Sequence, residues 1–156
     1  MHDPLTKPDR VTGVVIVDHG SRRTASNDLL LRVVDEFRSQ SDWSIVEPAH
    51  MELAEPSIET AFSRCVTAGA TRVVVFPYFL APGRHWTEDI PRLTAEAAAA
   101  YPEVEWLVTA PLGLHPSILA VIDDRIDHCL SRVAGQVDAC EICSDQAGCI
   151  GSREQC

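Results

Sequence analysis

The feature that most constrains the fold of this chain is the run VTGVVIVDH at residues 11–19. A strand with one solvated face alternates apolar and polar residues, whereas a strand covered on both faces is apolar almost throughout. This run is of the second kind. Three further strand-like runs follow it, so that the expected strands cover 11–19, 43–51, 71–79 and 105–111.

Segments with a helical spacing of apolar residues separate these runs. The expected helices cover 25–38, 57–68, Thr87 to shortly before Pro102, and 116–132. Such an alternation is typical of an α/β fold in which right-handed crossovers build a parallel sheet with helices on both faces. We therefore predict a four-stranded parallel sheet flanked by helices, with the strand order 2-1-3-4.

The chain has 156 residues, 46% of them hydrophobic, which is enough for one domain with a buried core. We expect a short N-terminal extension at 1–10 and the α/β domain at 11–133. The apolar periodicity is lost after Val133, so we expect an irregular, cysteine-rich tail at 134–156.

Charge and hydropathy argue against two classes of partner. The 23 acidic residues outnumber the 13 basic ones, for a net charge of −10, so we expect no nucleic-acid partner. We expect no membrane segment either, because no apolar run approaches the ~18 residues of a membrane span. The N-terminal stretch MHDPLTKPDR lacks the apolar core of a secretory signal, and we expect a cytoplasmic protein.

Four of the six histidines come at or shortly after the end of an expected strand: His19, His50, His85 and His115. In open α/β sheets the ligand crevice lies beyond the carboxyl ends of the strands, where the winding reverses. Strands one and three are neighbours in the order 2-1-3-4. The loops DHGSRR and LAPGRH, which carry His19 and His85, should therefore face one another.

His19 and His85 are the best placed of these histidines, and Gly20 and Gly83 beside them allow close backbone approach or a positive φ. Two neutral imidazoles that converge on a crevice suit a divalent metal such as Co, Ni, Fe or Zn. The alternative is that each is a surface loop histidine. Glu52, just past the second strand, is a candidate base or ligand, although its spacing alone favours a solvated loop acid.

Four stretches, VVIVDHGSR, MELAEPSI, VVVFPYFLAPGRHWTEDIP and PLGLHPSI, resemble in order and spacing the small class II chelatases of the CbiX/SirB type. The resemblance covers residues 11–132. It implies a chelatase-like fold related to the flavodoxin and Rossmann folds. It also implies insertion of a divalent metal into sirohydrochlorin, in cobalamin or siroheme biosynthesis, by a homodimer that builds the tetrapyrrole cleft.

The resemblance implies that His19 and His85 bind the metal, which is Co²⁺ or Fe²⁺, with Ni²⁺ as a further candidate. One of these histidines, with Glu52, would accept the protons that leave the macrocycle. A polycarboxylate substrate calls for cationic and hydrogen-bonding groups near the two loops. The expected substrate-binding residues are Ser21, Arg22, Arg84 and His115.

Other residues near these loops have simpler interpretations. His115 fits equally well as a packing residue at the start of a helix, and the resemblance assigns His50 no role. Glu88 and Asp89 fit the first turn of the helix that follows His85, where acidic residues are favoured.

Four cysteines, Cys140, Cys143, Cys149 and Cys156, form a C-x₂-C-x₅-C-x₆-C pattern in the tail. We expect them to hold a [2Fe–2S] cluster, with a [4Fe–4S] cluster, a zinc ion or unliganded thiols as alternatives. Two functions other than a chelatase also fit these residues. A metallochaperone would use the histidines and cysteines without turnover, and an iron–sulfur electron carrier would leave His19 and His85 unused.

Overall fold

The computed structural model describes residues 10–144 and divides into two compact units, one up to Gly113 and the other from Leu114 on. The first unit holds the sheet and three helices. The second holds α4 (Pro116–Val133) and the chain that follows it. Within the described residues, no helix is both long enough and apolar enough to cross a membrane. The predicted tail boundary at residue 133 stays a prediction.

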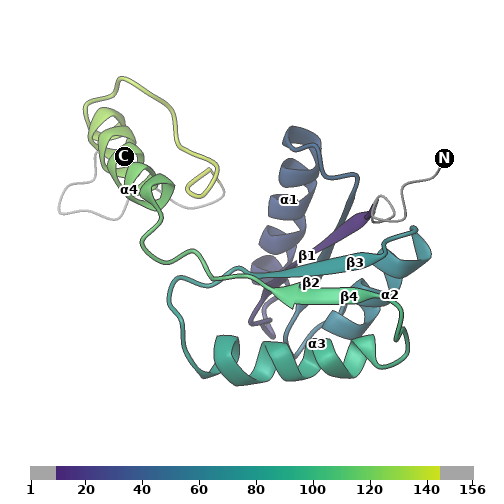
Figure 1. Cartoon of the computed structure of the whole chain (residues 1–156). Coiled ribbons are helices and arrows are strands. Elements are labelled where there is room, and N and C mark those ends of the chain that lie inside the picture. Colours follow the sequence, from purple (N-terminus) through teal and green to yellow (C-terminus); the bar gives the residue numbers. More distant parts are fainter. Residues whose placement is uncertain (1–9, 145–156) are drawn as a thin grey trace. The chain divides into compact units, whose positions relative to one another are not determined.

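The first unit is built on a sheet of four parallel strands in the order β2-β1-β3-β4. Figure 1 labels the strands and helices. The strands are β1 (Thr12–Asp18), β2 (Ile45–His50), β3 (Arg72–Pro77) and β4 (Glu105–Val108). The predicted parallel sheet and its order are confirmed. The last strand is shorter than expected, because its pairing with β3 ends at Val108.

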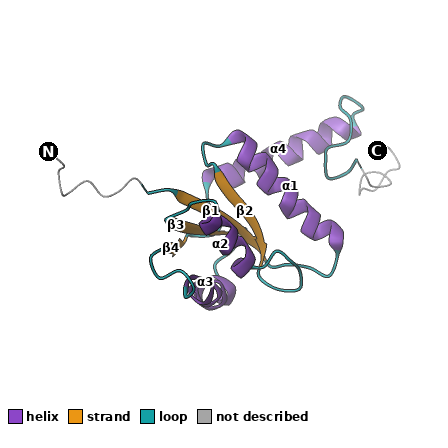
Figure 2. Ribbon diagram, turned by 90° about the vertical axis from the view of Figure 1, so that its right-hand side faces the viewer, coloured by secondary structure: helices purple, strands orange, loops and turns teal. Residues whose placement is uncertain are grey.

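The helices cover both faces of the sheet. α1 (Thr24–Gln40) lies on one face, and α2 (Ile58–Thr67) and α3 (Ile90–Ala98) lie on the other (Figure 2). Alternate side chains of β1 therefore enter different cores. Val15 and Val17 pack with the buried residues of α2 and α3, and Val14 and Ile16 pack with those of α1.

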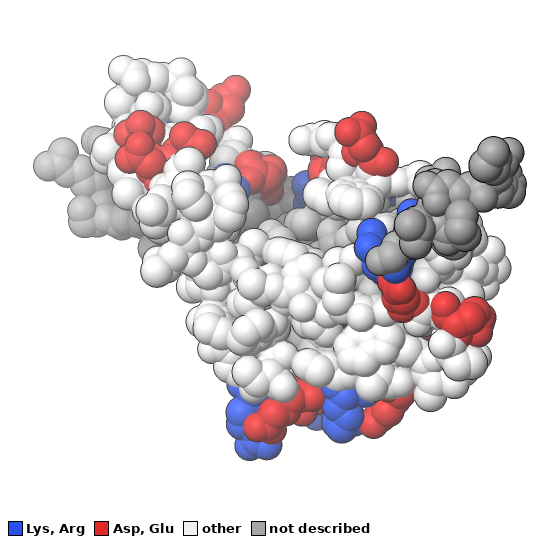
Figure 3. Space-filling model, viewed as in Figure 1, with Lys and Arg blue, Asp and Glu red and all other residues white. Residues whose placement is uncertain are grey.

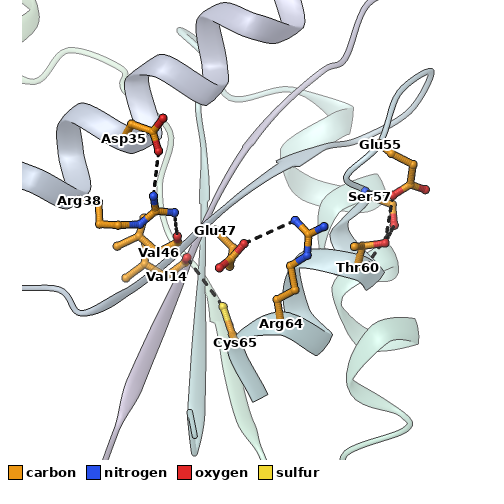
Figure 4. Close-up of polar contacts among 10 residues, drawn as sticks. All are labelled: Val14, Asp35, Arg38, Val46, Glu47, Glu55, Ser57, Thr60, Arg64 and Cys65. Atoms are coloured by element: carbon orange, nitrogen blue, oxygen red, sulfur yellow. Dashed lines mark hydrogen bonds and ion pairs between the residues drawn. The ribbon is translucent and has the colours of Figure 1, made fainter. Parts of the chain in front are cut away.

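α2 begins at the predicted cap, where the Ser57 hydroxyl accepts a hydrogen bond from Thr60 N at 3.2 Å (Figure 4). The helix lies close to β1 near Gly13, at which an added Cβ would stand 2.8 Å from Cys65 Cβ. Burial raises the pKa of the Cys65 thiol to about 12. This thiol is therefore a packing group of the core.

Candidate metal centre

The carboxyl ends of β1 and β2 bring His19 and Glu52 together. The pairing of the two strands continues past their last residues, with Met51 N donating to Asp18 O at 2.9 Å and Glu52 N donating to His19 O at 3.2 Å. The backbone thus holds Glu52 beside His19. These are the two strand ends at which the sequence predicted a site.

The His19 ring is oriented toward the Glu52 carboxylate. Its Nδ1–H donates to the Gly20 carbonyl at 3.2 Å, and its Nε2 lies 3.3 Å from Glu52 Oε1. In the neutral ring Nε2 then carries a lone pair, which faces the lone pairs of the Glu52 carboxylate oxygen. A cation between them, either a proton or a divalent metal ion, stabilises that arrangement.

His85 approaches this pair from the segment between β3 and α3. Its ring centroid lies 4.9 Å from that of His19, with the ring planes at 77°. Its Nδ1–H donates to Asp89 Oδ2 at 2.8 Å, which leaves Nε2 unprotonated in the neutral ring. Metal-binding histidines characteristically donate their second nitrogen to a carboxylate in this way.

The Asp89 contact depends on how the helix starts. A π-helical turn, η1 (His85–Asp89), precedes α3 and sets the two residues four apart on one helical face. The interpretation of Asp89 as only a helix-start residue is therefore incomplete. The signal that could have found the contact is the four-residue spacing from His85. Glu88, the other acid of that turn, pairs with Arg84 at 3.2 Å.

The two glycines of the facing loops behave differently. Gly20 has a φ of +86°, and an added Cβ would stand 1.9 Å from the Glu52 carbonyl oxygen, as the prediction of close approach requires. The same prediction is wrong for Gly83, which has open space around it. Its carbonyl instead accepts hydrogen bonds from Trp86 N and Thr87 N, both at 3.0 Å, and so starts the turn that carries His85.

The predicted substrate-binding residues lie in different surroundings. Asn27 holds Ser21 in place by accepting from Ser21 N at 2.9 Å and donating to Ser21 O at 2.7 Å. Arg22 is exposed. The Arg84 side chain is 83% exposed although it pairs with Glu88.

His115 belongs to the second unit, where it is the N-cap of α4. Its Nδ1 accepts a hydrogen bond from Ser117 N at 3.2 Å. This contact agrees with the alternative interpretation of a helix-start residue. The substrate-binding roles of all four residues stay predictions.

The cysteine pattern is described only in part, because Cys149 and Cys156 lie outside the described residues. Cys140 and Cys143 share one turn, in which Cys143 N donates to Cys140 O at 3.0 Å. Hydrogen bonds from the backbone N–H groups of Cys143 and Ile142 lower the pKa of the Cys140 thiol. The hydrogen bond to Cys140 raises the pKa of Cys143.

Comparison with known proteins identifies the family. The family model described as CbiX matches residues 13–129. The chain is 56% identical over 137 residues to the chloroplastic sirohydrochlorin ferrochelatase of Arabidopsis thaliana, which covers 88% of this chain and 61% of that protein. It is 34% identical over 128 residues to the sirohydrochlorin ferrochelatase of Priestia megaterium, which covers 81% of this chain and 48% of that protein.

A solved structure shares the fold. The sirohydrochlorin chelatase SirB of Bacillus subtilis subspecies spizizenii, in complex with cobalt, matches with a TM-score of 0.71 at 29% identity. The match covers 75% of this chain and 50% of that one. This chain therefore spans about half to three fifths of the length of these relatives.

The predicted cytoplasmic location is wrong, because the Arabidopsis relative, at 56% identity, is a chloroplastic protein. The prediction rested on the missing apolar core of a secretory signal. Plastid transit peptides have no such core and are marked by a Ser- and Arg-rich composition. The lack of an apolar secretory core therefore could not distinguish a plastid protein from a cytoplasmic one. With a family model that matches most of its length and a relative 56% identical over 88% of it, the chain belongs to the CbiX family.

Proposed function

We propose that this protein inserts a divalent metal into sirohydrochlorin. The observation that carries the proposal is the convergence of His19, Glu52 and His85 beyond the carboxyl ends of three neighbouring strands. The Arabidopsis and Priestia relatives are named as ferrochelatases of this substrate, and the Bacillus structure holds cobalt. The substrate metals we propose are accordingly Fe²⁺ and Co²⁺.

The chemistry requires the exchange of one metal ion for two protons. The macrocycle loses two pyrrole N–H protons and gains one M²⁺, so the site must deliver a cation and accept protons at the same place. The Nε2 atoms of His19 and His85 present lone pairs to the ion, and Asp89 keeps the His85 ring oriented. Glu52, 3.3 Å from His19 Nε2, accepts a departing proton directly or through that imidazole.

The open character of this centre suits an ion that must leave. Within residues 10–144, no group of three or more His, Cys, Asp or Glu side chains is placed to hold a metal ion, and the His19 side chain is 46% exposed. A structural metal has a closed ligand set, whereas an ion that takes part in the reaction keeps an open coordination position, here facing the macrocycle. Imidazole and carboxylate ligands select poorly among Fe²⁺, Co²⁺ and Ni²⁺, so metal supply decides which is inserted.

The function is tested by replacing the two histidines separately. His19→Ala and His85→Ala should each lower the rate of metal insertion by more than about tenfold, followed as the shift of the tetrapyrrole absorption spectrum. His128→Ala, in α4, is the matched control, because that ring bonds only the Asp138 carbonyl among the described residues. Metal binding without turnover in the wild type would favour a metallochaperone instead.

We further propose that two copies form the working enzyme. The Arabidopsis and Priestia ferrochelatases and the Bacillus SirB chain are longer than this chain, which matches 61%, 48% and 50% of them. A second copy would supply the other wall of the tetrapyrrole cleft. Figure 3 shows a face of the molecule whose centre has few charged side chains. Trp106 and Leu107 of the edge strand β4 are large apolar residues that are 39% and 43% exposed.

For the cysteines, we propose a [2Fe–2S] cluster. The backbone N–H groups that lower the pKa of Cys140 favour a thiolate there, which is the ligand form in iron–sulfur clusters and in zinc sites. Visible absorption of anaerobically purified protein should vanish in Cys143→Ser and persist in Cys129→Ser. A colourless protein with one zinc ion per chain would contradict the cluster.

We also propose a plastid location, supported by the name of the Arabidopsis relative. Antibodies against the chain should label plastids in its source cells. Labelling of the cytosol alone would contradict this location.

A further inference from the structure

A buried histidine that contacts an aspartate lies next to the His19 loop. His50, the last residue of β2, is 1% exposed, and its Nδ1 lies 2.6 Å from Asp18 Oδ1. The two residues are register partners at the ends of adjacent strands, so their side chains lie on the same face of the sheet. The other ring nitrogen of His50 is also buried and has no hydrogen-bond partner among the described residues.

The same Asp18 oxygen accepts a second hydrogen bond, from Gly20 N at 3.0 Å. Gly20 follows His19 and has the positive φ that turns the loop. The carbonyl of Gly20 in turn accepts the hydrogen bond from His19 Nδ1. A continuous chain of contacts thus runs from His50 through Asp18 and Gly20 to the His19 ring.

The backbone of His50 adds a second connection. Its N–H donates to Pro56 O at 2.7 Å, and the next two N–H groups bond to Asp18 O and His19 O. His50 therefore lies where β2 passes from the sheet into the segment that carries Glu52. His50 is thus connected to the His19 loop through Asp18 and is two residues from Glu52.

We propose that His50 is a positioning residue that acts through Asp18 to hold His19 and Glu52 in the geometry that binds the metal. This role rests on the proposed function. Packing alone does not explain a histidine here, because an apolar ring would fill the volume without burying an unpartnered nitrogen. The imidazole is needed for the hydrogen bond that orients Asp18, just as carboxylates that orient metal-binding histidines are themselves held by hydrogen bonds.

Three substitutions at His50 separate the hydrogen bond from the volume. His50→Phe keeps the ring and removes the donor, and should weaken Co²⁺ binding and kcat/KM by about tenfold to a hundredfold. His50→Asn places an amide N–H where Nδ1 stands and should restore most of the loss. His50→Gln carries its amide one bond further out and should not restore it. Co²⁺ binding is measured from its visible absorption with the metal alone, and insertion is measured with sirohydrochlorin.

Non-additivity tests whether His50 acts through Asp18. The double variant Asp18→Ala/His50→Phe should bind Co²⁺ no more weakly than Asp18→Ala alone, because both changes break the same connection. Independent, additive losses would overturn the proposal. If His50→Phe does not fold, the comparison of His50→Asn with His50→Gln carries the same test.

The control is Thr94→Val, which removes the other buried polar side chain of the described residues, bonded to Ile90 O at 2.7 Å. It should lower the thermal midpoint without changing Co²⁺ affinity. Wild-type affinity and turnover in His50→Phe would overturn the positioning role while the metal site stands. Unchanged Co²⁺ binding in His19→Ala would instead overturn the metal site, and the positioning role with it.

Discussion

Gly20 lets the segments of His19 and Glu52 lie close together because it has no Cβ atom. Its φ is +86°, and a Cβ there would stand 1.9 Å from the Glu52 carbonyl oxygen. Gly20→Ala must therefore push apart the two segments that carry His19 and Glu52. We expect it to lower metal insertion by more than about tenfold, as for the loss of a contact that orients a ligand. Insertion rates and Co²⁺ titration measure the effect.

Gly69 provides the matched control for this change. It also has a positive φ, +102°, but nothing lies within 4 Å of an added Cβ. Gly69→Ala should cost the backbone about 1–2 kcal/mol of unfolding free energy and leave the insertion rate unchanged. Equal insertion rates in the two alanine variants would contradict the steric role of Gly20.

Asp89 is expected to contribute through His85. Asp89→Ala removes the 2.8 Å hydrogen bond that fixes the His85 ring, and should weaken metal binding by about tenfold to a hundredfold. Glu96→Ala removes a comparable exposed contact, the ion pair with Arg92 at 2.9 Å, and should leave metal binding unchanged. Co²⁺ titration compares the two variants. Equal affinities would show that Asp89 is only a helix-start residue.

At the scale of the elements, the sequence was sufficient to locate the strand ends and insufficient to determine register. The continuous Val/Ile run and the regular alternation predicted the parallel sheet, and with it the meeting of His19 and His85. The Asp18–His50 contact depends on which residue of β2 stands beside which residue of β1. Because β1 is apolar on both faces, its hydrophobic pattern does not distinguish this register from one shifted by a residue.

The start of a helix is similarly hard to predict from sequence. The helix after β3 was expected from Thr87, but the helical turn begins at His85. Two residues are within the usual uncertainty of a helix boundary, yet they decide whether His85 and Asp89 lie on one face. The interpretation of Asp89 was incomplete for this reason, because the contact with His85 depends on where the helical turn begins.

The burial of Cys65 between α2 and β1 makes the free energy of unfolding decrease at alkaline pH. Cys65 has a pKa of about 12 in the fold, against an ordinary value of 9.0, because it is buried and near Glu47. Between these two values the folded state holds a proton that the unfolded state has lost. The contribution of Cys65 to stability is therefore fully present below pH 9 and is lost as the pH rises toward 12.

Urea unfolding at pH 8, 9, 10 and 11 measures this dependence. The free energy of unfolding should fall by up to about 1.4 kcal/mol per pH unit above pH 9 through this thiol. Cys65→Ala should be less stable at pH 8, because it leaves a cavity beside Gly13. Its free energy of unfolding should fall less steeply with pH above pH 9, because the thiol is gone. The same slope in both proteins would show that the thiol ionises as easily in the fold as in the unfolded chain.

At the scale of the whole molecule, the proposed pairing predicts a mass of two chains in solution. β4 is an edge strand, and its Leu107 side chain is 43% exposed beside Val74, its register partner on β3. An exposed apolar edge favours association, and a single lysine there opposes it. Leu107→Lys should therefore shift light-scattering mass from two chains toward one. Leu29→Lys, on an equally exposed leucine of α1, should not.

Turnover should follow the same equilibrium, because one chain supplies only one wall of the cleft. The insertion rate per chain should fall on dilution. In Leu107→Lys this fall should begin at a higher protein concentration than in the wild type. Co²⁺ binding to His19 and His85 should change much less, since both lie within one chain. A mass of one chain with a constant rate per chain at every dilution would exclude the dimer while leaving the metal centre intact.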